Sequence, residues 1–370
     1  MRLQKIYRVS LFFFLLIIRP ITGVLAQTND FTGYTFFINP GHGGLDSNDR
    51  HMLETDFWES EGNLTKGLYL RDLLEKMHAN VILSRITNTT EDDLELSVID
   101  EMANESGADC FLSIHSNGGN GTDNYPLVLF RGYDNEPVFN SAKSLSDILW
   151  QELFQKSNCW TYTARNSRGD WSFYPSWGAK VGLGVLRTLT MPGVLSEGSF
   201  HDYIPEGWRL RNADYLHHES WAFLRALMKY YGITSTGNGI IAGTVRDTLQ
   251  VPAWYCKPGT RDERVPLNGV SVTLTPGYQT YTTDTHNNGY FFFDSLAPGN
   301  YTLHFQGSTD YYKDSLPVTV NANQTTIADC YLRFDTTRMP VLLSMLPDIK
   351  EDVPLNQEFT LSFNLPMDTS

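Results

Sequence analysis

The sequence is poor in cysteine and in basic residues. Its 370 residues contain four cysteines, and no two of them form a Cys-x-x-Cys pair, so a cysteine-based metal site is not expected. Lysine and arginine number 28 against 42 aspartates and glutamates, which gives a net charge of −14 at pH 7. Proteins that bind nucleic acids use clustered Lys and Arg side chains to replace the counterions of the phosphate groups, and this sequence predicts no such basic surface. We therefore expect neither nucleic acid nor anionic lipid headgroups as partners.

Long apolar runs are also missing, apart from one near the N-terminus. That run, Val9–Ile18, follows three basic residues and precedes the small or apolar residues Val24–Ala26. This order is typical of a secretory signal peptide, and the run is too short to span a bilayer. We predict that residues 1–26 direct export to the periplasm, the cell envelope or the exterior, and that the mature chain has no membrane span.

If the protein is exported, its cysteines can form disulfides. Cys256 and Cys330 fall in the same later segment, and either a disulfide between them or two free thiols is compatible with the sequence. Cys110 lies in an apolar run and is expected to be a buried free thiol.

The chain divides into regions with different periodicity. Strand-like and helix-like segments alternate over residues 27–232, which predicts an α/β domain, an open twisted sheet with helices on both faces. Residues 233–238 are rich in small and polar residues and predict a linker. Over 239–334, short alternating strands separated by turn signals predict an all-β sandwich. Residues 338–370 are typical of the start of a further β domain, which suggests that the native protein continues.

The α/β region allows its elements to be placed. In order, we predict a strand over 34–38, a helix over 59–77, a strand over 81–83, a helix over 92–106, strands over 108–114 and 126–130, a helix over 141–156, strands over 184–189 and 193–196, and a closing helix over 213–227.

Polar residues follow several of these strands. His42 lies in the glycine-rich loop Asn39–Gly44 after the first strand, and His115 and Glu197 follow two later strands, while Glu59 opens the first helix. Because ligands bind at the carboxyl ends of strands in an open α/β sheet, these side chains are expected to converge. Two imidazoles and a carboxylate with an open fourth position form a hydrolytic zinc site. A carboxylate outside the metal shell must then take a proton from the bound water, and Glu197 suits that role.

The segments around these residues occur in an order that a known family shares. They are Asn39–Gly44, Glu59–Leu64, Val81–Arg85, Ala103–Asn104, Ala108–Asn117, Val185–Arg187 and Met191–Phe200. Residues 34–232 thereby resemble the zinc-dependent N-acetylmuramoyl-L-alanine amidases of the amidase-3 type. The resemblance implies zinc held by His42, Glu59 and His115, with Glu197 as catalytic base. It also implies cleavage of the amide between N-acetylmuramic acid and L-alanine in peptidoglycan.

The sequence departs from the family in three places. Ile99 stands where an arginine is usual, and Ile86 where an acidic residue is usual. The segment 118–182 is idiosyncratic and rich in Trp and Tyr, which either bind glycan rings by stacking or pack in the fold. These departures concern substrate fit rather than the metal ligands.

The later regions also have resemblances. Gly243–Asp247, Gly269–Leu274 and Gly289–Tyr301 resemble parts of a carboxypeptidase regulatory-like β-sandwich, over residues 239–334. The stretch Leu361–Thr369 resembles the opening of a bacterial immunoglobulin-like module. Both resemblances imply spacers or contacts with the cell envelope rather than chemistry.

Other interpretations of the same residues remain open at this point. Glu54 and Glu61 compete with Glu59 for the ligand role, since acidic residues at a helix start are common. His201 could assist the reaction, but the expectation is that it lies at the surface. His217–Glu219 resembles half of a His-Glu-x-x-His zinc site, but Ala222 occupies the position of the second ligand. Two other functions are also compatible with the sequence, a catalytically inactive envelope-binding or adhesion protein and a zinc peptidase that acts on wall peptides.

Overall fold

A computed structural model describes residues 29–363, apart from 46–50, 157–166, 235–236, 336, 338–339, 349–350, 352 and 355. The predicted signal peptide, Cys159, the aromatic residues Trp160 and Tyr162, and residues 364–370 lie outside the described residues. Among the described helices, none has the length and apolar character needed to cross a bilayer.

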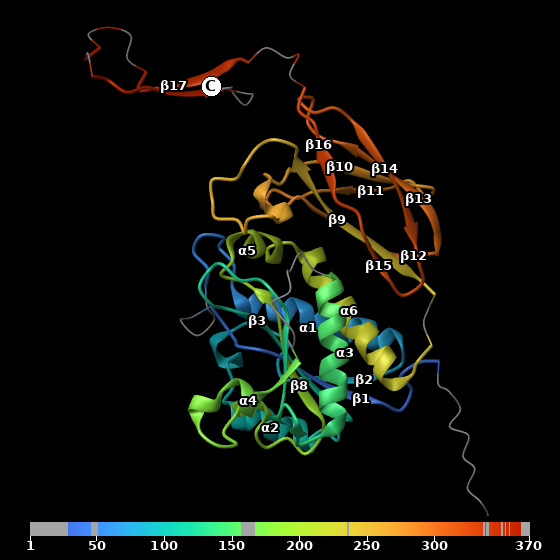
Figure 1. Ribbon diagram of the computed structural model, residues 1–370. Helices are drawn as coiled ribbons and strands as arrows, with labels where there is room; N and C mark the ends of the chain where they lie inside the picture. The colour runs from blue at the N-terminus through green and yellow to red at the C-terminus, as the bar shows by residue number, and fades with distance from the viewer. Residues whose placement is uncertain are drawn as a thin grey trace, which may run out of the picture.

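The first domain is built on a six-stranded sheet in the order β2-β1-β3-β8-β4-β7 (Figure 1). The strands are β1 (Thr35–Pro40), β2 (Asn80–Leu83), β3 (Cys110–Asn117), β4 (Leu127–Phe130), β7 (Ser167–Gly169) and β8 (Gly193–Phe200). The strands β2, β1, β3 and β8 are parallel, whereas β4 is antiparallel to β8 and pairs in parallel with β7. The predicted open sheet is confirmed, and it is a mixed sheet.

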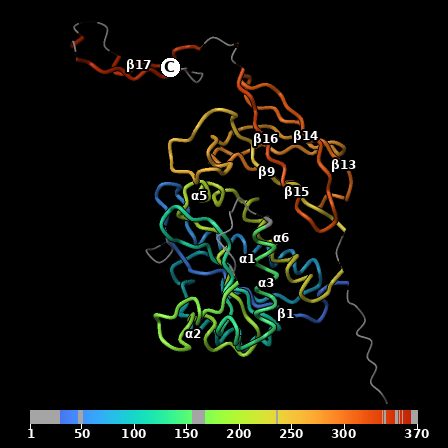
Figure 2. Tube along the Cα trace, viewed as in Figure 1, coloured from blue at the N-terminus to red at the C-terminus, as the bar shows by residue number. Residues whose placement is uncertain are grey.

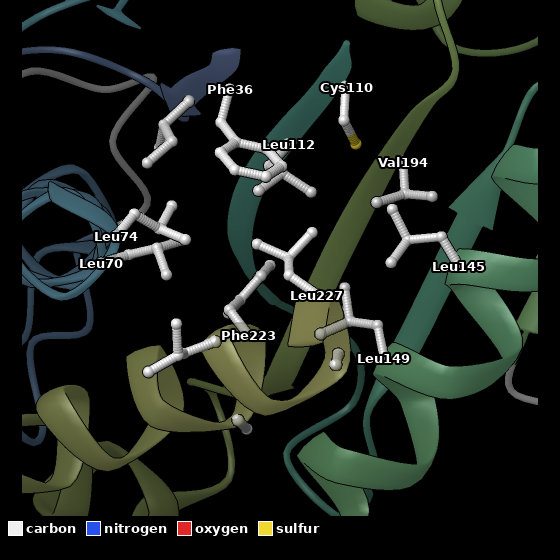
Figure 3. Close-up of a cluster of buried hydrophobic side chains, with 14 of the residues drawn as sticks. Phe36, Leu70, Leu74, Cys110, Leu112, Leu145, Leu149, Val194, Phe223 and Leu227 are labelled. Atoms are coloured by element: carbon white, nitrogen blue, oxygen red, sulfur yellow. The ribbon is translucent and has the colours of Figure 1, made fainter. Parts of the chain in front are cut away.

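Helices cover both faces of this sheet, as predicted. The helices α1 (Glu59–Lys76), α3 (Asn140–Lys156) and α6 (Ala213–Tyr231) cover one face. Figure 3 shows the core on that side, where Phe36 and Leu112 of the sheet face Leu74, Leu149 and Leu227 of the helices. Each fully buried side chain of this kind stabilises the fold by roughly 1.5–3 kcal/mol. The helix α2 (Leu96–Glu105) and the short turn η4 (Gly184–Leu186) cover the other face.

Some predicted elements differ from those observed. Residues 184–189 do not form a strand: Gly184–Leu186 form the helical turn η4, and Val185, Leu186 and Leu189 all pack into the core beneath α2. That spacing of one and four residues suits a helical turn. Among the described strands, β3 pairs with β1 on one side and with β8 on the other. The predicted helix over 92–106 begins only at Leu96, because a capping box between Thr89 and Asp92 closes a separate turn, η2 (Thr90–Asp92). The helix α5 (Ile204–Leu210) was not predicted.

The second domain is a β-sandwich, as predicted. One sheet has the order β11-β10-β13-β14, and in the other β9 pairs with β12, β15 and β16. The strands are β9 (Gly239–Asp247), β10 (Ser271–Thr275), β11 (Gln279–Thr282), β12 (Tyr290–Leu296), β13 (Gly299–Gln306), β14 (Asp314–Val320), β15 (Thr325–Ile327) and β16 (Cys330–Leu332). Its core includes Val272, Phe291 and Phe305. Beyond it, β17 (Leu342–Leu346) and β18 (Thr360–Phe363) form an antiparallel pair.

The remaining short elements lie in connections. They are β5 (Gly132–Tyr133), β6 (Glu136–Pro137), α4 (Asp170–Phe173), and the turns η3 (Pro175–Trp177) and η5 (Arg261–Glu263). Cys110, Cys256 and Cys330 are free thiols, so the Cys256–Cys330 disulfide is not formed. Cys110 is buried, as expected.

The two domains are packed against each other over α5 and α6, which lie directly beneath the sandwich in Figures 1 and 2. An apolar cluster joins Leu210, Tyr215 and Leu216 of the first domain to Tyr290 and Phe292 of the second. The sandwich is therefore docked on the first domain through a shared apolar core, despite the small-residue stretch that connects them.

A buried charge cluster crosses the same interface. The carboxylate of Asp262, in η5, accepts hydrogen bonds from Arg209 of α5 at 2.8 Å, Arg246 of β9 at 2.9 Å and the Tyr203 hydroxyl at 3.0 Å. Burial would raise the pKa of Asp262, but the two guanidinium groups outweigh it and hold that pKa below its ordinary value. Asp262 is thus anionic at neutral pH and links the domains.

Candidate metal centre

The loop after β1 holds His42 in a left-handed backbone conformation, and its glycine neighbours allow other groups to approach closely. His42 itself has a φ of 61°, in the left-handed region. A Cβ atom on Gly41 would lie 2.0–2.6 Å from ring atoms of His115, and one on Gly43 would lie 2.3 Å from the backbone of Asp92 and Asp93. Glycine is therefore required at both positions for the two histidines and the neighbouring turn to approach one another.

Glu59, the first residue of α1, lies between the two histidines. Its side chain is buried, whereas Glu54 and Glu61 are exposed. Its Oε1 accepts a hydrogen bond from the backbone N–H of Ser116 at 3.0 Å and lies 3.2 Å from Nδ1 of His115. Its Oε2 lies 3.4 Å from Nε2 of His42. Of the three acidic residues considered at this helix start, only Glu59 points into the site.

The surroundings of Glu59 and His115 favour the protonation states in which these two side chains bind metals. Burial would raise the pKa of Glu59, but the imidazoles of His115 and His42 beside the carboxylate outweigh it and keep the pKa well below its usual value. Burial lowers the pKa of His115, against the opposing attraction of Glu59. An ionised carboxylate beside a neutral imidazole is the form in which both residues bind metals.

The donor atoms of His42, Glu59 and His115 all lie within 4.8 Å of one another. Glu59 Oε2 is buried and makes no hydrogen bond of good geometry to the described residues. A buried acceptor left open beside two imidazoles is a group that a bound cation would satisfy. Two imidazole nitrogens and a carboxylate form the donor set of hydrolytic zinc sites, so these residues fit that ion.

Glu197 lies beside this cluster on the neighbouring strand. In the parallel register of β3 and β8, Glu197 is the partner of His115. Both residues line a cavity of about 480 Å³ together with His42 and Glu59. The structure therefore brings all four sequence-predicted site residues to one cavity, from two strands, one loop and one helix start.

Two basic residues that support the cluster were missed by the sequence reasoning. Arg85, buried after β2, donates to the carbonyl oxygens of Pro40 at 2.8 Å, Gly41 at 3.0 Å and Ser60 at 2.6 Å, and so joins the His42 loop to the start of α1. Lys66 is fully buried, donates to the hydroxyl of Ser116 at 2.9 Å and pairs with Glu219 at 3.1 Å. Spacing places Lys66 two helical turns after Glu59 on the same face of α1, but it does not indicate that the lysine is buried.

The other histidines have structural contacts. His201 is 2% exposed, so the expected surface position is wrong. Its Nδ1 lies 2.9 Å from the carbonyl oxygen of Ser116 and 3.9 Å from Glu59 Oε2, and its backbone N–H donates to the carbonyl oxygen of Asn117 at 2.8 Å. His218 contacts the sandwich through Tyr290 and Thr325, at 2.9 Å each. The adjacent Glu219 faces Lys66 instead, so these two residues do not form a second metal site.

The rest of the cavity wall combines apolar residues with polar ones, among them Asp92 and Asp93. Ile99 lines it with Leu96, Leu183 and Val185. Tyr174 and Trp177, from the idiosyncratic segment 118–182, form part of the wall. These two side chains do not fill the cavity. No lysine or arginine lines this cavity among the described residues.

Comparison with known proteins identifies both domains. A family model described as N-acetylmuramoyl-L-alanine amidase matches residues 36–229, and one for the carboxypeptidase regulatory-like domain matches residues 260–333. The chain is 29% identical over 182 residues to the N-acetylmuramoyl-L-alanine amidase CwlM of Bacillus licheniformis, covering 49% of this chain and 62% of the relative. It is 25% identical over 202 residues to the sporulation-specific N-acetylmuramoyl-L-alanine amidase of Bacillus subtilis, covering 55% and 70%.

A solved structure shows a similar match. The N-acetylmuramoyl-L-alanine amidase AmiC2 of Nostoc punctiforme is 24% identical, with a TM-score of 0.44, and the match covers 54% of this chain and 99% of that one. The chain spans about three fifths of the length of the Bacillus licheniformis relative. The resemblances of the first two domains to the amidase and carboxypeptidase regulatory-like families are confirmed. Because the amidase model matches more than half of its residues, the chain belongs to the N-acetylmuramoyl-L-alanine amidase family.

Proposed function

We propose that this protein is a zinc-dependent amidase that cleaves the bond between N-acetylmuramic acid and L-alanine in peptidoglycan. The observation that carries the proposal is the cluster of His42, Glu59 and His115 beside Glu197 in one cavity. Membership of the amidase family supports the choice of substrate.

The proposed roles divide the site into ligands and a base. His42, Glu59 and His115 hold the ion, which when bound supplies an acidified water and polarises the carbonyl to be attacked. Glu197 takes the proton of that water and passes it to the departing amide nitrogen. Ser116 and Arg85 keep Glu59 and the His42 loop in position. Export to the cell envelope would bring this site to its substrate, and the β domains would supply further envelope contacts.

Product analysis tests the proposal against its alternatives. Purified muropeptides are incubated with the zinc-loaded protein, and the products are identified by mass spectrometry. Stem peptides with a free N-terminal alanine are the expected product. Shortened stems that remain attached to the sugar would show a peptidase instead, and binding without any cleavage would show an envelope-binding protein.

Replacing His115 with alanine is expected to remove both zinc and turnover. Loss of a residue that only supports a ligand weakens metal binding by about 10–100-fold, so the loss of a ligand should exceed that range. Zinc content is measured by metal analysis after dialysis. His217→Ala is the control, because His217 stacks on Tyr69 outside the cavity. Full zinc occupancy in His115→Ala would refute the ligand role.

A further inference from the structure

The cavity has an aromatic wall that the proposed chemistry does not use. Tyr174 and Trp177, after α4 and at the end of η3, line the cavity together with His42 and Glu197. Neither ring belongs to the apolar clusters of the described residues. Trp177 is 51% exposed, so core packing does not account for it.

The two rings are stacked, which fixes their orientation. Their centroids lie 3.9 Å apart and their planes differ by 6°. Tyr174 covers one face of the indole, so the rest of the half-exposed Trp177 ring remains accessible to a ligand. A flat aromatic surface held in this way loses little conformational entropy when it binds a ligand.

Hydrogen bonds join the two ends of the backbone segment that carries the rings. Asp170 is buried at the start of α4, and its carboxylate accepts hydrogen bonds from the backbone N–H groups of Gly132 at 2.9 Å and Leu183 at 2.8 Å. Gly182 has a φ of +51°, and a Cβ there would lie 2.1 Å from Asp170 Oδ2. Asp170 thus ties the beginning of this segment to its end, and the aromatic pair is presented at a defined place on the cavity wall.

We infer that Trp177, backed by Tyr174, is a stacking platform for a saccharide ring of the glycan strand near the scissile amide. This inference rests on the proposed function, which supplies a substrate with sugar rings. A pyranose ring presents a face of C–H bonds that packs on an aromatic face and carries no charge for the acidic protein to repel. A stem peptide carries carboxylates, which need cationic or N–H donors. The cavity wall also contains Leu183, Val185, Asp92 and Asp93, and among the described residues it contains no lysine or arginine.

Binding of separate substrate parts to the full chain tests the inference. Calorimetry measures the affinity for peptide-free oligomers of N-acetylglucosamine and, separately, for a sugar-free L-alanyl stem peptide. Trp177→Ala should weaken oligomer binding by about 5–100-fold, taking as the scale the loss found when an aromatic side chain that stacks on a nucleobase is replaced by alanine. Trp177→Phe should retain most of the affinity, and binding of the stem peptide should not change. Tyr278→Ala, which removes an 80% exposed ring on the sandwich, is the control for general loss of aromatic surface.

Three outcomes would overturn the platform. They are equal oligomer affinity in Trp177→Ala and the unaltered protein, no oligomer binding by the unaltered protein, and a loss confined to the stem peptide. Thermal unfolding of Trp177→Ala verifies that the exposed substitution leaves the fold intact. Neither binding probe contains the scissile amide. Absence of turnover on muropeptides would therefore refute the proposed function without altering the binding result.

Discussion

Replacing Glu197 with glutamine is expected to leave zinc bound and to lower turnover by about 10²–10⁴-fold, the contribution typical of a positioned general base. Glutamine keeps the size of the side chain but cannot take a proton from water. Glu197 lies outside the cluster of three donors, so the metal should stay. The measurement combines zinc content with the rate of release of stem peptides from muropeptides.

Glu61→Gln is the matched control for this substitution. Glu61 is an exposed glutamate two residues after Glu59 in the same helical turn, and its replacement should change neither zinc content nor rate. Unchanged turnover in Glu197→Gln would defeat the proposed mechanism. Loss of zinc in that variant would instead assign Glu197 to the metal shell.

Replacing Asp262 with asparagine is expected to lower the free energy of unfolding of the protein by about 3–5 kcal/mol, as when one partner of a buried ion pair is removed. The substitution preserves shape but leaves the guanidinium groups of Arg209 and Arg246 without their shared anion. Both arginines are buried at the interface between the domains. Urea denaturation measures the loss. The same substitution at Asp72, which forms a half-exposed pair with Arg71, should cost only about 0–1 kcal/mol.

The pH dependence of stability provides a separate check on Asp262. Because its pKa is held below the ordinary value, its contribution to stability is present at neutral pH and is lost as the pH falls through the folded-state pKa. The unaltered protein should therefore lose its advantage over Asp262→Asn in acid. A difference in stability that persists unchanged into strong acid would contradict this assignment of charge.

The sequence was sufficient to predict the elements that converge on the site, because each functional residue lies in the last part of a strand, directly after one, or at the start of a helix. His42, His115 and Glu197 could be found in this way. Contacts that depend on packing between distant segments could not. Lys66 looks like an ordinary helical lysine, and its burial follows only from the approach of α6, which brings Glu219.

The same reason explains the predictions that were wrong. An apolar stretch such as 184–189 suits either a strand or a buried turn, and the neighbouring elements decide between them. The composition of residues 233–238 predicts a linker but carries no information about the surfaces on either side of it. The histidine at position 218 shows the difficulty, since its two partners, Tyr290 and Thr325, are supplied by another domain.

The docked sandwich also constrains how the protein meets an extended polymer. It packs on α5 and α6, whereas α2 and α4, which adjoin the aromatic and apolar wall of the cavity, lie at the opposite end of the molecule (Figure 1). An attachment made through the sandwich would thus fix the direction in which the cavity faces as well as its distance from the point of attachment. If the proposed function holds, the two domains would have to move together, by translation and rotation, to reach successive amides along a glycan strand. The spacing of the amides cleaved on intact sacculi would then depend on that fixed orientation.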